Sequence, residues 1–221
     1  MTAAWAFRRR LTEWAVLYAN GRIFTCMSSG IEKGRPRFEF SGMSAHDRTV
    51  LIQTGTATKG GQRMRLSGLP RLVDDPAAMD LLRRIATGEF NLADWDDEPD
   101  YDPDNPPPEP PTYPESPPPP PEYLREWNLA TDPIEHAVIY DDGCVVTIWA
   151  HSVETTPNHY RFHVMLDDGA DVIMGTATRP GAVCLLVGSP ALADDAGTEA
   201  ILAAAYDGDV GPARDRGLRA G

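Results

Sequence analysis

One pattern of apolar runs and turn residues occurs twice along the chain. Residues 14–21 read WAVLYANG and residues 136–143 read HAVIYDDG, at an offset of 122 residues. In both segments an apolar run ends in a turn dipeptide with glycine, and a second apolar run follows. Apolar runs joined by such a turn are typical of a β-hairpin. The pattern therefore predicts two equivalent hairpins.

Further matches extend this repeat. Residues 55–59 (GTATK) are matched by residues 175–179 (GTATR) at an offset of 120. Between the hairpin and the motif, apolar and polar residues alternate, which predicts another strand in each copy. The residues aligned there are Arg37 and Phe38 in the first copy and Arg161 and Phe162 in the second. Beyond the motif, the same offset aligns Pro70, Asp74 and Asp75 with Pro190, Asp194 and Asp195. We expect a tandem duplication.

Each copy is expected to end in a helix. Asp75 is suited to cap a helix N-terminus, and Pro76 to occupy its first position. Apolar residues recur at helical spacing at Met79, Leu82, Ile85 and Ala86, and the second copy does the same over residues 195–205. The expected fold class is α+β, with about four or five antiparallel strands and a C-terminal helix per unit. A short helix is also expected at residues 3–11.

A polar segment separates the two copies. Residues 94–122 carry ten carboxylates and no Lys or Arg, and 13 prolines lie between residues 99 and 121. Such a segment favours an extended polyproline II spacer and cannot pack as a core. We therefore expect a first unit at residues 1–93, a linker at 94–122, a second unit at 123–206 and a disordered tail at 207–221.

Composition adds limits to this organisation. The chain has 221 residues, of which 42% are hydrophobic, as in ordinary soluble proteins. No apolar run approaches the roughly 18 to 20 residues that span a bilayer, and no secretory signal is recognised. Cys26, Cys144 and Cys184 are odd in number and form no CxxC motif, which argues against a disulfide framework or a zinc site. These features predict a cytoplasmic protein without a membrane partner.

Charge divides the two units. The formal net charge is −13, yet residues 1–93 hold 14 basic and 8 acidic side chains, against 6 and 15 in residues 123–221. On two expected strands of the first unit, arginines alternate and so would share a strand face, which predicts a basic patch of Arg35, Arg37, Arg63 and Arg65. Three interpretations are open: charge complementarity with the second unit or the linker, nucleic-acid binding, and ordinary surface or attachment of an acidic partner.

The repeated GTAT motif is the first candidate site. Two threonine hydroxyls on one strand face and a following cation could hold an anion or a cofactor phosphate. The residues concerned are Thr56, Thr58, Lys59, Thr176, Thr178 and Arg179. A strand that ends in a turn accounts for the same residues without any ligand.

A resemblance to a known family rests on the same region. The hairpin, the strand that ends in Thr58 and Lys59, and the following segment from Gly68 to Leu82, with its Asp-Asp-Pro and helix, resemble the split β-barrel of flavin- or deazaflavin-dependent oxidoreductases. The resemblance implies a flavin phosphate site near residues 54–59, including Thr54. No cofactor is expected otherwise.

Three histidines form the second candidate site. His159 and His163 alternate on one expected strand, and His151 lies close in sequence. Such imidazoles could bind a metal or transfer protons, although a polar strand face explains them equally. In the alignment above, the first copy has Glu39 in place of His163. No recognised catalytic signature accompanies these residues.

The function expected from these patterns is a non-enzymatic, two-lobed interaction protein. Its acidic second unit and linker would bind a basic protein partner, as an inhibitor, an immunity-type protein or an assembly factor does. The alternatives are the flavin-dependent oxidoreductase, and a nucleic-acid binder that uses the arginines of the first unit. The duplicated units would form an intramolecular pseudo-dimer.

Overall fold

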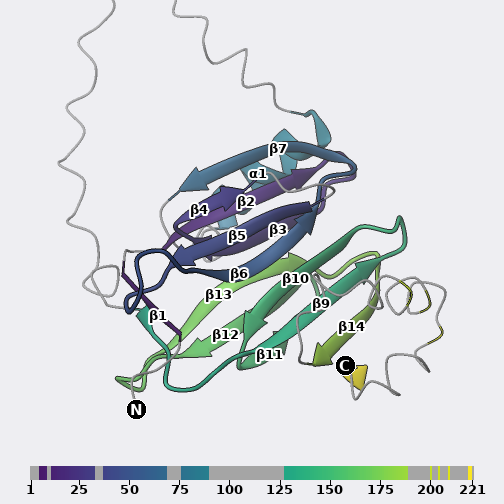
Figure 1. Ribbon diagram of the computed structural model, residues 1–221. Helices are drawn as coiled ribbons and strands as arrows, with labels where there is room; N and C mark the ends of the chain where they lie inside the picture. Colours follow the sequence, from purple (N-terminus) through teal and green to yellow (C-terminus); the bar gives the residue numbers. More distant parts are fainter. Residues whose placement is uncertain are drawn as a thin grey trace, which may run out of the picture.

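The structure is a computed structural model that describes residues 5–8, 11–32, 37–68, 76–89 and 127–188, and positions 200, 204, 209 and 219–220. Antiparallel strands and one short helix make up this part of the chain (Figure 1), which confirms the β-rich antiparallel prediction. No helix within it is long and apolar enough to cross a membrane. The expected linker at 94–122 and most of the expected helix at 195–205 lie outside the described residues.

Within the described residues, each half of the chain contributes six strands of three or more residues, where about four or five were expected. Those of the first half are β2 (Thr12–Tyr18), β3 (Ile23–Ser28), β4 (Gly30–Glu32), β5 (Arg37–Met43), β6 (Leu51–Thr58) and β7 (Gln62–Gly68), followed by α1 (Pro76–Thr87). Those of the second half are β9 (Ile134–Tyr140), β10 (Val145–Ala150), β11 (Ser152–Thr155), β12 (His159–Met165), β13 (Asp171–Thr178) and β14 (Ala182–Gly188). Three strands of two residues complete the set: β1 (Ala6–Phe7), β8 (Trp127–Asn128) and β15 (Arg219–Ala220).

Both large sheets contain strands from both halves. One has the order β11-β12-β13-β3-β2-β7, and the other the order β15-β14-β9-β10-β6-β5-β4. The halves meet where β13 pairs with β3 and where β6 pairs with β10. In Figure 1 the first half, in purple and blue, lies above the second half, in green. The two expected units are therefore joined by continuous sheets rather than separated.

The two halves have equivalent topology. The strands β2 to β7 of the first half correspond, in order, to β9 to β14 of the second half. Exchanging each strand for its equivalent converts the order β11-β12-β13-β3-β2-β7 into β4-β5-β6-β10-β9-β14, which is the order of the other sheet without β15. We call residues counterparts when they are offset by 122 up to the end of β5 and by 120 from β6 onward. The loop between β5 and β6 is two residues longer than the loop between β12 and β13, which accounts for the change of offset.

This equivalence corrects one part of the sequence alignment. Phe40 faces Gly55 across β5 and β6, as Phe162 faces Gly175 across β12 and β13, and a β-bulge follows both phenylalanines. The counterpart of Phe162 is therefore Phe40 and not Phe38. The expected alignment was displaced by two residues, and because strand side chains repeat every two residues it still looked consistent.

The main core lies between the two sheets. Buried side chains of one sheet, such as Val16, Phe24 and Phe162, belong to one cluster with Phe40 and Val138 of the other. These residues alternate with outward-facing positions along their strands, as one buried face of a sheet requires. Burying each such side chain is worth about 1.5–3 kcal/mol before entropy is counted.

A second cluster lies under α1. The helix begins at Pro76 and buries Leu82 and Ile85 against Leu17 and Ile23 on the outer face of β2 and β3. The N-terminal segment differs from expectation: Ala6 and Phe7 form β1, which pairs with β8, so the helix expected at residues 3–11 is wrong there. This segment finds its hydrogen-bonding partners in a segment about 120 residues away, and local pattern does not report such pairings.

Candidate functional site at the junction of the two halves

The repeated GTAT motif lies at the junction between the halves. Gly55, Thr56 and Ala57 of β6 pair with Ile148, Thr147 and Val146 of β10. Likewise Gly175, Thr176 and Ala177 of β13 pair with Cys26, Thr25 and Phe24 of β3. In both large sheets, one of the two strands paired across the junction therefore carries a copy of the motif.

The threonine hydroxyls of the motif bond to the opposite half. Buried hydroxyl pairs join Thr56 to Thr147 and Thr25 to Thr176, each at 3.0 Å between the Oγ1 atoms. The Thr58 hydroxyl donates to the Val145 carbonyl oxygen at 2.9 Å and accepts from the Val145 N–H at 3.0 Å. Thr178 makes the equivalent pair of bonds with Ile23, at 3.1 and 2.9 Å.

The glycines of the motif are explained by close approach of the two halves. A Cβ atom on Gly175 would lie 2.2 Å from the Thr25 carbonyl oxygen, and one on Gly55 would lie 2.5 Å from the Thr147 carbonyl oxygen. Backbone oxygens in paired strands cannot move away without breaking the sheet. The motif thus has a structural role in both copies.

The hairpin turns of the two halves also touch. The Asn20 side-chain amide donates to Asp142 Oδ2 at 2.9 Å, and Arg22 forms ion pairs with Asp141 and Asp142. The Arg22 guanidinium also lies 4.3 Å from the centre of the Tyr140 ring. Burial raises the pKa of Asp142, but the Cys144 backbone N–H and Arg22 outweigh it, so this pKa is lowered overall. The first half thus meets the second through complementary charge at this point.

Two tyrosines and a cysteine lie buried behind these turns. The Tyr18 hydroxyl donates to the Thr58 carbonyl oxygen at 2.9 Å, and its counterpart Tyr140 donates to the Thr178 carbonyl oxygen at 2.7 Å. Burial raises the pKa of both phenols, and it raises the pKa of the Cys144 thiol to about 11. Burial also raises the pKa of the Cys26 thiol to about 12. Groups held in their protonated form are poor nucleophiles.

Arg63 and Arg65 of the expected basic patch lie in different surroundings. The Arg65 guanidinium lies 4.8 Å from the centre of the Phe38 ring, and the Lys59 ammonium lies 5.3 Å from it. Phe38 belongs to the main core between the two sheets. Arg63 instead donates to the Ala86 carbonyl oxygen of α1 at 3.3 Å. A β-bulge opposite Leu17 and Tyr18 separates the two arginines, so they do not share a strand face. Arg35 lies outside the described residues.

His151 has a role that its counterpart also performs. It lies at the corner where the chain passes from β10 to β11, as Ser29 does between β3 and β4. Its Nδ1 accepts from the Met165 N–H at 2.7 Å, and the Ser29 hydroxyl accepts from the Met43 N–H at 3.3 Å. Its Nε2 lies 3.1 Å from the Thr131 hydroxyl. The imidazole therefore supports the corner of the sheet.

His163 lies among charged groups on the outer face of β11, β12 and β13. Its Nδ1 is 3.2 Å from an Asp171 carboxylate oxygen and its Nε2 is 3.6 Å from Glu154, which also pairs with Arg161. His159, on the same strand, has its pKa lowered by burial and by Arg161. Among the described residues, no group of three or more His, Cys, Asp or Glu side chains is arranged to hold a metal ion.

Sequence reasoning missed two buried carboxylates. Glu13 and Glu135 are counterparts, and they are only 2% and 0% exposed. The signal was available, because the hairpin match extends by one residue at the same offset, to the pattern Glu-X-Ala-Val-X-Tyr. Hydrophobic patterning did not draw attention to a charged residue at the start of a strand.

No protein-family model, no curated protein and no solved structure matches this chain.

Proposed function

We propose that this protein is a non-enzymatic binding protein, produced by duplication of one β-rich unit, whose acidic second half engages a basic protein partner. The duplication accounts for the equivalent strand orders and for a motif that serves the same junction twice. The binding role concerns the surfaces in which the two halves differ.

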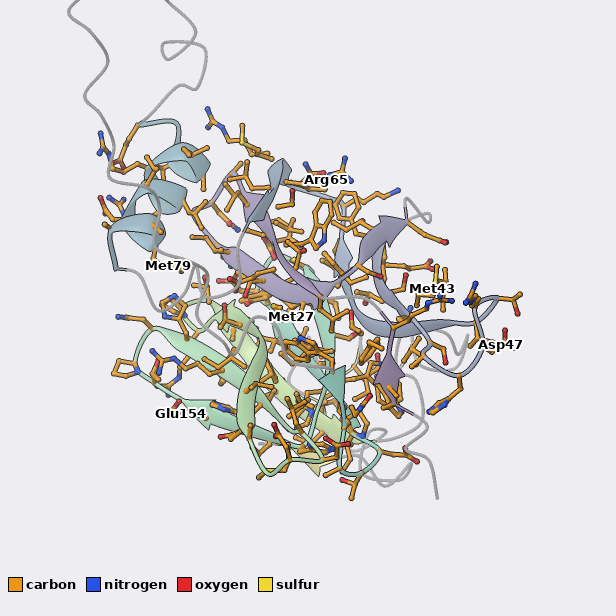
Figure 2. The ribbon with its side chains drawn as sticks, turned by 90° about the vertical axis from the view of Figure 1, so that its left-hand side faces the viewer. Met27, Met43, Asp47, Arg65, Met79 and Glu154 are labelled. Atoms are coloured by element: carbon orange, nitrogen blue, oxygen red, sulfur yellow. The ribbon has the colours of Figure 1, made fainter. Side chains whose placement is uncertain are left out.

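The observation that carries this proposal is the separation of charge across two halves of equivalent fold. The described second half, residues 127–188, holds eight carboxylates and two cationic side chains, Arg161 and Arg179. Five of its carboxylates are exposed away from the junction, at Asp132, Glu154, Asp167, Asp168 and Asp171. Figure 2 shows Glu154 in the lower part of the molecule and Arg65 in the upper part, and their strands β11 and β7 form opposite edges of one sheet. Surface charges of one sign produce an electrostatic field that accelerates association with an oppositely charged protein.

The engagement of polar groups in the fold supports a non-enzymatic role. The GTAT hydroxyls join the halves, His151 supports a corner, and burial raises the pKa values of the Cys26 and Cys144 thiols. A catalytic group must instead be poised near a substrate with a suitable pKa.

Affinity capture from the native host tests the proposal. The full-length protein is immobilised beside a variant with Glu154→Gln, Asp167→Asn, Asp168→Asn and Asp171→Asn. A control variant removes four carboxylates of the first half, at Glu32, Asp47, Asp80 and Glu89. We expect a basic protein to be retained at low salt by the wild type and the control, and to be lost from the second-half variant. Equal retention by all three proteins would contradict the proposal.

The flavin alternative remains a separate proposal, and its test is direct. Thr54 and Thr56 are 0% and 1% exposed, and Thr58 bonds to Val145, so a flavin phosphate would have to use other groups of this region. A rise in melting temperature with a flavin or deazaflavin, lost in Lys59→Ala, would support that alternative.

The nucleic-acid alternative depends on Arg37 and Arg65, together with Arg35 outside the described residues. Binding of the full-length protein to single-stranded DNA or RNA at low salt, weakened by Arg37→Ala and Arg65→Ala, would support it.

A further inference from the structure

The outer edge of β14 shows how this fold accepts an added strand. β15 pairs antiparallel with it, so that Leu186 faces Ala220 and Val187 faces Arg219. On its other side β14 pairs with β9, where Leu186 faces Ala137. An extended segment from elsewhere in the chain thus extends the sheet beyond its hairpin.

The counterpart of this edge belongs to β7. Leu66 is the counterpart of Leu186 and faces Ala15, the counterpart of Ala137, so the two edges have the same register. β7 is the last strand of its sheet, and no other strand in the described part of the chain pairs with its outer side. An edge of this kind presents backbone N–H and C=O groups to an incoming strand.

The side chains at the two edges differ in charge. Leu185 of β14 is 5% exposed and belongs to the main core, whereas its counterpart on β7 is Arg65. The Arg65 guanidinium and the Lys59 ammonium both lie against the Phe38 ring, at the rim of the core beside this edge. The first half thus places the cation Arg65 where the second half completes an apolar core, whereas both halves have a cation at the position of Lys59, which is Arg179 in the second half.

We propose that the edge of β7 binds an extended, acidic segment of a partner protein by antiparallel strand addition, as β15 adds to β14. Backbone hydrogen bonds to β7 would supply the general affinity, and a carboxylate beside Arg65 and Lys59 would supply the selectivity. This inference concerns the first half and does not depend on the basic partner proposed for the second.

Charge decides between the occupants of this edge. Antiparallel pairing of β7 with β7 of a second copy, centred on Arg65, would place the Arg65 side chains of both chains on the same face of the joined sheet, and like charges on facing strands destabilise a sheet. A partner strand with carboxylates at alternate positions has all of them on one face, where one carboxylate can lie beside Arg65. We therefore assign the edge to an acidic partner segment rather than to self-association.

The test uses the full-length protein and a short fluorescent peptide of alternating glutamate and valine, with a lysine and valine peptide for comparison. Fluorescence anisotropy should show salt-sensitive binding of the acidic peptide alone. Arg65→Leu introduces the residue that the counterpart position carries, and it should weaken binding about tenfold. Arg48→Leu removes an equal charge from the exposed loop between β5 and β6, and it should leave binding unchanged.

Hydrogen exchange of the wild type provides a measurement that does not depend on how the variant folds. Peptide binding by strand addition should slow exchange in β7, with β4 and β11 unaffected. Binding of the lysine peptide with similar affinity, equal weakening by Arg48→Leu, or protection outside β7 would each overturn the proposal.

Discussion

Asn20 and Asp142 are counterparts in the two halves, and they are also hydrogen-bonded to each other, at 2.9 Å between Nδ2 and Oδ2. Contact between counterparts is expected near a pseudo-twofold axis, and the reciprocal pairings of β3 with β13 and of β6 with β10 have the same symmetry. Ala6 and Asn128, offset by the same number of residues, pair in the same way between β1 and β8. The halves therefore associate like the two subunits of a symmetric dimer.

Cutting the chain within residues 94–122 should leave the two halves associated. The first half alone would expose the edges of β3 and β6, and the second half alone would expose those of β13 and β10, which are paired across the junctions in the intact protein. A specific protease site introduced in this segment allows the test by size-exclusion chromatography after cleavage. We expect one peak that contains both fragments, with the uncut protein as the control. Two separate monomeric fragments would show that the junctions do not hold the halves together.

Removing the Thr25 hydroxyl should cost more stability than removing that of its counterpart Thr147. Both residues are fully buried and both pair with a threonine of the other half, but Thr25 Oγ1 also accepts from the Thr176 N–H at 3.1 Å. A buried donor left unsatisfied costs about 1–3 kcal/mol. The free energies of unfolding of Thr25→Val and Thr147→Val, from urea titration, give the comparison. Equal losses would mean that the additional bond contributes nothing.

Gly175→Ala should destabilise the protein by several times more than Gly30→Ala. The added methyl group on residue 175 would meet the Thr25 backbone oxygen at 2.2 Å, whereas nothing lies within 4 Å of the corresponding position on Gly30. Overpacking against backbone typically costs about 1–3 kcal/mol or more. Melting temperatures of the two variants provide the measurement, and similar values would contradict the close approach at the junction.

The contribution of Asp142 to stability should depend on pH. Its pKa in the folded protein is lowered, since bonds from the Cys144 N–H and Arg22 exceed the opposing effect of burial. The ionised carboxylate therefore stabilises the fold above its unfolded pKa of about 3.9, and this stabilisation is lost as pH falls through the lower folded value.

Urea titrations of the wild type and of Asp142→Asn, from neutral pH to acid pH, test this expectation. The difference in unfolding free energy should be largest near neutral pH and should shrink toward acid. The same substitution in an Arg22→Gln background should show a smaller difference throughout. A difference that grows on acidification would contradict the assigned direction.

The sequence by itself determined the β-rich class, the hairpin at residues 14–21 and the start of α1 at Pro76, because period-two patterning, turn glycines and helix caps act over a few neighbouring residues. The sequence also placed the GTAT motif in strands, but it left open whether the threonine hydroxyls serve the structure or bind a ligand. Only the tertiary structure paired Thr56 with Thr147 and Thr25 with Thr176, at separations of 91 and 151 residues. Only the tertiary structure shows that a bulge places Arg63 and Arg65 on different faces, and that the counterpart of Phe162 is Phe40 rather than Phe38. Strand neighbours and register are set by packing between distant segments, and no local pattern records which strand lies beside which.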